Sequence, residues 1–94
     1  GLQVLELTPQ IARQLGVAPD TQGLVIASVD QNSDAARKGL QRGHIILTAN
    51  YRPMTSVADL ENAVRSAKAE NRDAVLLRIQ RRGGSPQYVA IRLR

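Results

Sequence analysis

The alternation of apolar and polar residues predicts where the strands lie. Residues 1–7 alternate weakly, and residues 23–29 (GLVIASV) form a short apolar run of strand length. The run at residues 44–50 (HIILTAN) is nearly continuous, which is typical of a strand buried on both faces at the centre of a sheet. Residues 72–80 and 87–93 alternate again on either side of the turn RRGGSP, and this pattern predicts a β-hairpin.

Two short helices are expected between the first strands. Thr8 can cap a helix that begins at Pro9 and ends at Leu15, where Gly16 can take a left-handed conformation. A single helical turn follows the capping residues at 32–34 and is stopped by a glycine at the end of the segment AARKG.

The longest helix is expected to open at Thr55 or Ser56. Asp59 follows Ser56 by three residues, which indicates a capping box. Apolar residues then recur at helical spacing, so one face of this helix should pack on the sheet; they are Val57, Leu60, Val64 and Ala67. The element order is therefore β, α, β, short α, β, α, β, β, an α+β arrangement.

The composition narrows the fold to one small domain with an aliphatic core. The chain has 94 residues, and we expect a single domain over residues 1–94. Tyr51 and Tyr88 are the only aromatic residues, and Cys, Phe and Trp are absent. The apolar runs are far shorter than the roughly 20 residues that cross a bilayer, so no direct membrane insertion is expected. We expect any signal peptide to lie outside this sequence.

The chemistry of an enzyme is not apparent in this sequence. His44 is the only histidine, and we interpret it as a strand-end residue that hydrogen-bonds locally. The serines at 28, 33, 56, 66 and 85 fit strand, cap or turn positions, so we expect no catalytic residue here. Scattered aspartates show no metal-ligand spacing, and Gly83-Gly84 fits a hairpin turn better than a phosphate cradle. We expect no metal and no cofactor.

The formal net charge of +5 raises the question of nucleic acid. The arginines are spread along the chain, and the aromatic residues on which single-stranded bases stack are almost absent. We therefore expect no nucleic-acid partner. A basic nucleic-acid-binding domain remains an alternative, and it predicts salt-sensitive oligonucleotide binding.

Three motifs together resemble the PDZ domains that follow the protease domain in the HtrA/Deg family of bacterial serine proteases. They are the strand GLVIASV, the segment AARKGLQRG leading into IIL, and a proline followed by a helix that opens SVADL. The similarity covers nearly the whole chain. The resemblance implies a PDZ-like small β-sandwich or partly open barrel, of about five strands with one long and two short helices.

The resemblance implies a peptide-binding site that lies between the first strand and the long helix. There, an extended ligand adds a strand to the exposed edge of the sheet. In such domains, backbone N–H groups of a loop before the first strand receive the ligand's terminal carboxylate. This loop maps onto Gly1, Leu2, Gln3, Val4 and Leu5. On the helix, the ligand-facing positions map onto Val57, Glu61, Val64 and Arg65. Val57 and Val64 could instead belong to the core stripe.

Two residues depart from the family pattern. His44 stands where an aspartate is usual, and Tyr51 follows Asn50 where a glycine is usual. Because tyrosine is strained at positive φ, the second departure predicts a changed turn. The lack of Phe and the missing glycine within residues 2–5 favour the second, more C-terminal PDZ domain of a two-PDZ protease.

The expected function is that of a non-catalytic peptide-binding module of a periplasmic serine endoprotease. Its partners would be extended peptides or C-termini of unfolded substrates, in protein quality control with protease or chaperone character, and other protomers of the parent. A first alternative is a PDZ domain that acts mainly in oligomer assembly. A second is a PDZ domain of a site-two membrane metalloprotease, whose sequence outside this segment would carry an H-E-x-x-H helix.

Overall fold

The structure, a computed structural model, describes residues 2–81 and 84–93. Gly1 of the expected peptide site and Gly83 of the expected hairpin turn lie outside the described residues. The helices and strands follow one another as β1 (Leu2–Glu6), α1 (Pro9–Leu15), β2 (Leu24–Val29), α2 (Asp34–Arg37), β3 (Ile45–Ala49), β4 (Arg52–Pro53), α3 (Val57–Ala69), β5 (Ala74–Gln80) and β6 (Gln87–Arg92).

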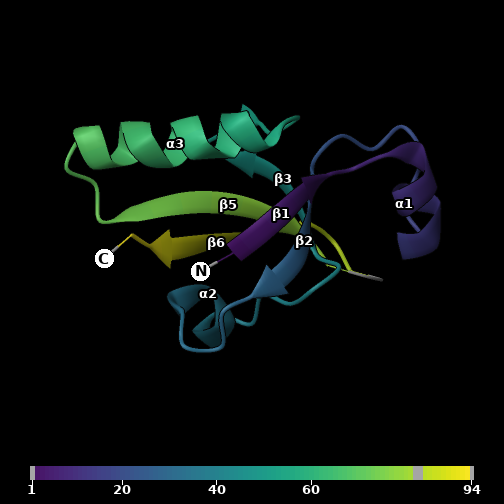
Figure 1. Cartoon of the computed structure of the whole chain (residues 1–94), viewed down its shortest axis with the longest axis horizontal. Helices are drawn as coiled ribbons and strands as arrows, with labels where there is room; N and C mark the ends of the chain where they lie inside the picture. The colour runs from purple at the N-terminus through teal and green to yellow at the C-terminus, as the bar shows by residue number, and fades with distance from the viewer. Residues whose placement is uncertain (1, 82–83, 94) are drawn as a thin grey trace.

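An antiparallel sheet runs in the order β1-β2-β3-β5-β6, and β4 pairs with β3 beside this path. β3 lies at the centre of the sheet, as its apolar run predicts. The sequence-based order of elements is confirmed, with the addition of the two-residue strand β4. α3 lies along one side of the molecule and α2 along the other, while α1 stands at one end (Figure 1).

The predicted helix caps are present. The Thr8 hydroxyl accepts a hydrogen bond from the Ile11 N–H at 3.2 Å, and Gly16 ends α1 at φ 77°. At α3, the Ser56 hydroxyl accepts from the Asp59 N–H at 3.2 Å, and the Asp59 carboxylate accepts from the Ser56 N–H at 3.2 Å. This reciprocal pair is a capping box, which fixes where α3 begins.

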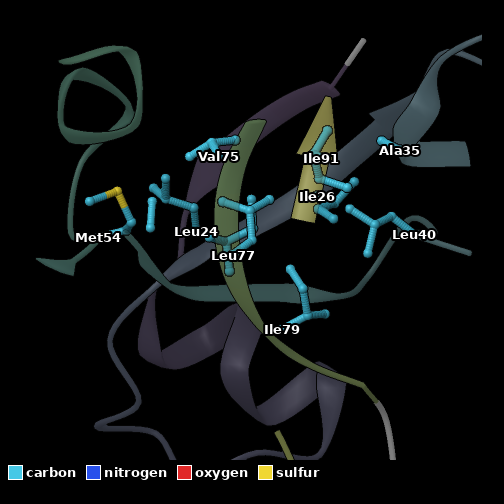
Figure 2. Close-up of a cluster of buried hydrophobic side chains, with 11 residues drawn as sticks. Leu24, Ile26, Ala35, Leu40, Met54, Val75, Leu77, Ile79 and Ile91 are labelled. Atoms are coloured by element: carbon cyan, nitrogen blue, oxygen red, sulfur yellow. The ribbon is translucent and has the colours of Figure 1, made fainter. Parts of the chain in front are cut away.

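The core is aliphatic, as the composition predicts. Its largest fully buried side chains come from three neighbouring strands and include Leu24, Ile26, Ile46, Leu77 and Ile79. Figure 2 labels four of these strand residues together with Ala35, Leu40 and Met54, which approach from the helix and loop segments; the four are Leu24, Ile26, Leu77 and Ile79. The sheet and the segments around α2 and α3 therefore share one apolar cluster.

The turn between β3 and β4 differs from our expectation. Asn50 and Tyr51 have φ values of 49° and 67°, so the tyrosine takes the left-handed conformation that we expected it to avoid. Asn50 explains how this turn is held, because its backbone N–H donates to the Leu76 carbonyl at 2.7 Å. Its side-chain oxygen also accepts from the Leu76 N–H at 3.0 Å. These two bonds tie the turn to β5.

Candidate functional site

β1 is an edge strand with one unpaired side. Among the described residues, it pairs with β2 alone, and the register shifts between Gln3 and Val4. α3 contacts β1, and Figure 1 shows α3 along the top of the molecule with β1 below it. The N–H and C=O groups on a free strand edge can pair with a further strand.

A pocket of about 600 Å³ opens beside this edge, and we call it the α3–β1 groove. Its interior is largely apolar, while charged side chains stand among its lining residues. The lining consists of Leu2, Ser33, Asp34, Ala35, Leu60, Glu61, Val64, Arg65, Lys68, Val75, Leu77, Ile91, Arg92 and Leu93. A concave apolar surface with a few polar groups is the usual form of a binding site.

The α3 side of the groove is formed by residues three and four positions apart. Val64 is half-buried, whereas Glu61, Arg65 and Lys68 are exposed. Residues at this spacing project from one side of a helix, so a ligand along α3 meets Val64 between charges of both signs. Arg65 donates to the side-chain oxygen of Asn62 at 3.0 Å, a bond between neighbouring turns of α3.

The far end of the groove is held by Asp34. Its carboxylate accepts a hydrogen bond from the backbone N–H of Arg92 at 2.9 Å, which joins α2 to β6. The Arg37 guanidinium, which is itself exposed, lies 3.9 Å from the other oxygen of Asp34, a long ion pair of little energetic weight. α2 is thereby fixed against β6, and Ala35 completes the apolar lining.

The structure brings four of the nine residues expected at the peptide site into the groove lining, namely Leu2, Glu61, Val64 and Arg65. The other described residues of β1 differ in environment. The Gln3 side-chain oxygen accepts from the Ser28 hydroxyl at 3.2 Å, Val4 packs on the core, and Leu5 is 53% exposed. Val57 is half-buried at the first turn of α3 and is not a lining residue.

Sequence reasoning missed part of the lining. Leu60 was assigned to the core stripe alone, and Lys68 was not expected at the site. Both lie on the groove side with Val64, at the i+4 spacing that the sequence displays. Ile91 and Leu93 could not be found in this way, because only the folded sheet brings β6 close to α3.

The described part of the chain contains neither a cluster of metal-ligating side chains nor a membrane-spanning helix. Residues 2–81 and 84–93 hold no group of three or more His, Asp or Glu side chains that could bind a metal ion. No helix among these residues is long and apolar enough to span a bilayer.

The strand order, the open edge of β1 and the groove beneath α3 together define a PDZ-like domain with one candidate binding groove. A family model described as "PDZ domain" matches residues 1–93, and the chain belongs to this family. Among PDZ domains, the chain is of the HtrA/DegP type, because its relatives and structural neighbours are of that type.

A curated relative from Chlamydia pneumoniae, named a probable periplasmic serine endoprotease DegP-like, is 36% identical over 92 residues. That alignment covers 98% of this chain and 18% of the relative, so the chain spans less than a fifth of that protein. Among solved structures, the HtrA3 PDZ domain bound to a phage-derived ligand (FGRWV) matches with a TM-score of 0.78 and 26% identity, covering 98% of this chain and 80% of that one. The HtrA-type protease AlgW with a decapeptide matches with a TM-score of 0.65 and 30% identity, covering 97% of this chain and 26% of that one.

Proposed function

We propose that the chain is a non-catalytic module that binds extended peptides in the α3–β1 groove. The observation that carries the proposal is the free edge of β1 directly beside an apolar pocket. A peptide added to that edge would pair with the main chain of Leu2–Glu6 and place alternate side chains toward α3. Main-chain bonds would supply affinity, and the groove would supply selectivity.

The proposed contacts follow from where the groove residues lie. Residues 1–5 would contribute backbone groups to the ligand. The groups at the start of β1 would lie nearest to the ligand's terminal carboxylate. Leu2 and Val64 would contact an apolar ligand side chain, while Glu61 and Arg65 would bias the residues at its flanks. Val57 would contact only a ligand long enough to reach the first turn of α3. Structures of HtrA-type PDZ domains with short peptides support this use of the fold.

The parent protein is proposed to be a periplasmic serine endoprotease, because the DegP-like relatives carry that name. In that setting, the peptides would be extended segments or C-termini of unfolded substrates. The module would present them to a protease domain that lies outside these residues. We place the chain as the second of two PDZ domains in such a parent, because residues 2–5 contain no glycine to form a carboxylate loop.

Binding in the groove can be tested with a matched pair of α3 variants. Val64→Lys places a charge in the apolar lining, whereas Ala58→Lys places the same side chain on the exposed side of α3. Peptides with apolar C-termini would be measured by fluorescence anisotropy. We expect Val64→Lys to weaken binding about tenfold or more, since losing burial of a Val-sized group costs at least about 1.4 kcal/mol.

Ala58→Lys should change the affinity less than about twofold, and circular dichroism would check that both variants remain folded. Equal weakening by the two variants would place the peptide elsewhere. Each peptide is also measured with an amidated C-terminus. Loss of binding on amidation supports carboxylate capture near β1, and equal binding by both forms supports recognition of internal segments.

A second function, in oligomer assembly, is favoured by one surface feature. Tyr51 and Tyr88 are 72% and 53% exposed, and their rings lie 5.8 Å apart. The Arg78 guanidinium lies 6.0 Å from the centre of the Tyr88 ring. Exposed Tyr and Arg side chains in contact are enriched at protein–protein interfaces. This cluster is therefore the surface through which protomers would meet.

Sedimentation equilibrium of the wild type and of Tyr88→Ala tests the assembly function. We expect concentration-dependent self-association of the wild type that Tyr88→Ala weakens, since the ring supplies apolar area and a polar end. Val64→Lys should leave self-association unchanged. If the wild type stays monomeric up to millimolar concentration, the proposed self-association through this cluster is wrong.

A further inference from the structure

A second cavity, of about 240 Å³, lies beside the end of α1, between the start of β3 and the end of β5. We call it the His44 pocket. One part of its lining is apolar and comprises Leu15, Val17 and Ile45. Another part is basic and comprises Arg42, His44 and Arg81. Among the described residues that line this pocket, none is acidic.

Arg81 brings a guanidinium group to the lining of this pocket. Its Nη1 donates to the side-chain oxygen of Gln87 at 3.2 Å, whereas its buried Nε has no hydrogen-bond partner in the described part of the chain. A buried donor without an acceptor is costly and uncommon. Neither Arg42 nor Arg81 forms an ion pair with a described residue. The pocket therefore lacks a counter-charge.

His44 supplies a second donor. Its Nδ1 accepts a hydrogen bond from the backbone N–H of Gln41 at 3.1 Å, so the neutral ring carries its proton on Nε2. Burial, and next the charge of Arg81, lower the pKa of His44 below its ordinary value of 6.5. The imidazole is therefore neutral at pH 7 and donates only through Nε2.

We propose that the His44 pocket binds a small aliphatic carboxylate. Arg81 and Arg42 supply the positive charge, and the Nε2 of His44 is a donor for a carboxylate oxygen. Leu15, Val17 and Ile45 accommodate the aliphatic part, which inorganic phosphate lacks. This site is separate from the α3–β1 groove, with which it shares no lining residue.

The single histidine makes the pocket observable by proton NMR. The imidazole Cε1–H resonance of His44 needs no assignment by mutagenesis, and its pKa is measured by pH titration. An anion beside the ring favours the charged imidazolium, so bound 3-methylbutanoate should raise the pKa of His44 with saturation. Sodium chloride at matched ionic strength controls for screening of the Arg81 charge. Inorganic phosphate tests whether the aliphatic group matters.

Variants assign the response to this pocket. Arg81→Gln should abolish the 3-methylbutanoate-dependent shift and, without ligand, raise the pKa of His44 because the repulsion is removed. Arg42→Gln, at an exposed turn residue with little influence on folding, should weaken the response. Arg72→Gln, which removes an equal charge from an exposed residue outside the pocket, should leave it unchanged.

No saturable shift beyond that of sodium chloride would overturn the proposal. A response to phosphate as large as that to 3-methylbutanoate would overturn the assignment to an aliphatic carboxylate. Retention of the response in Arg42→Gln and in folded Arg81→Gln would overturn the assignment to this pocket. Peptide affinity in the α3–β1 groove is measured separately. The proposal of peptide binding and the proposal of carboxylate binding can therefore fail independently of each other.

Discussion

Gly23 stands where the chain enters β2 beside the backbone of β3. A Cβ atom at this position would lie 2.7 Å from the carbonyl oxygen of Ile46 and 2.8 Å from Cγ2 of Ile45. Since one of these contacts is with backbone, it cannot be relieved by a change of rotamer. The glycine that opens the GLVIASV motif is therefore required by close packing of two strands.

We predict that Gly23→Ala lowers the free energy of unfolding by about 1–3 kcal/mol, as overpacking does. Urea denaturation of wild type and variant measures the difference. Gly84→Ala is the matched control, because a Cβ there would meet nothing within 4 Å. Alanine at this position reduces the conformational freedom of the unfolded chain, so the free energy of unfolding of Gly84→Ala should equal that of the wild type or be slightly higher. A neutral Gly23→Ala would show that β2 and β3 can separate without cost.

His44 should make stability depend on pH. Its pKa is lowered in the folded state, so below pH 6.5 the unfolded chain binds more protons than the folded chain. The contribution of neutral His44 to stability is therefore fully present above pH 6.5. It declines as the pH falls from 6.5 toward the lowered pKa of the folded state. Protonation of Nδ1 also removes the acceptor for the Gln41 N–H.

We predict that the wild type loses more unfolding free energy than His44→Asn between about pH 7.5 and 5.5. Asparagine cannot titrate, yet its side-chain oxygen can accept from Gln41. Urea denaturation at both pH values measures the two losses. Identical losses would show that His44 is as readily protonated in the folded as in the unfolded chain.

At the scale of elements, the caps determine how well the helices could be predicted. α1 begins where Thr8 was expected to cap it, and α3 begins at Ser56, one of the two caps expected, because a cap is a local signal within four residues. β4 was missed, since two residues are too few to show a period and Arg52–Pro53 becomes a strand only by pairing with β3. Local chemistry therefore predicted elements well, except where pairing alone defines them.

The capping box of α3 is predicted to contribute measurably to stability. Ser56→Ala removes the acceptor for the Asp59 N–H and should lower the free energy of unfolding by about 1 kcal/mol. Ser66→Ala, inside the same helix and exposed, should be neutral or slightly stabilising, because alanine favours helix. Thermal or urea denaturation compares the two. A larger loss for Ser66→Ala would contradict the role of the cap.

The same box makes the start of α3 sensitive to acid. Hydrogen bonds from Thr55, and then from Ser56, lower the pKa of Asp59 below its ordinary value of 3.8. The stabilisation from this carboxylate is present above that pH and is lost as the pH falls through the lowered value. This acid range is separate from that of His44, so the two groups can be distinguished by titration.

At the scale of the whole molecule, the groove shows the limit of sequence reasoning. Leu2 and Val64 were expected there by resemblance, and the structure places both in the lining. Ala35 joins them because α2 lies against β6, where the Asp34 carboxylate accepts from the Arg92 N–H, and Ile91 joins them because the sheet brings β6 close to α3. The His44 pocket was not foreseen at all, since Leu15 and Arg81 are separated by most of the chain. A site assembled from distant segments produces no periodic pattern of residues in the sequence, so pattern analysis cannot predict it.

The exposed tyrosine pair has a consequence for how this protein can be observed. Tyr51 and Tyr88 are its only aromatic residues, and they lie together where the β3–β4 turn meets β6. Tyrosine fluorescence and near-ultraviolet circular dichroism therefore report on this corner, whereas the aliphatic core is spectroscopically silent. A tyrosine transition that precedes the far-ultraviolet transition would record separation of the corner strands, and coincident transitions would record cooperative unfolding of the whole molecule.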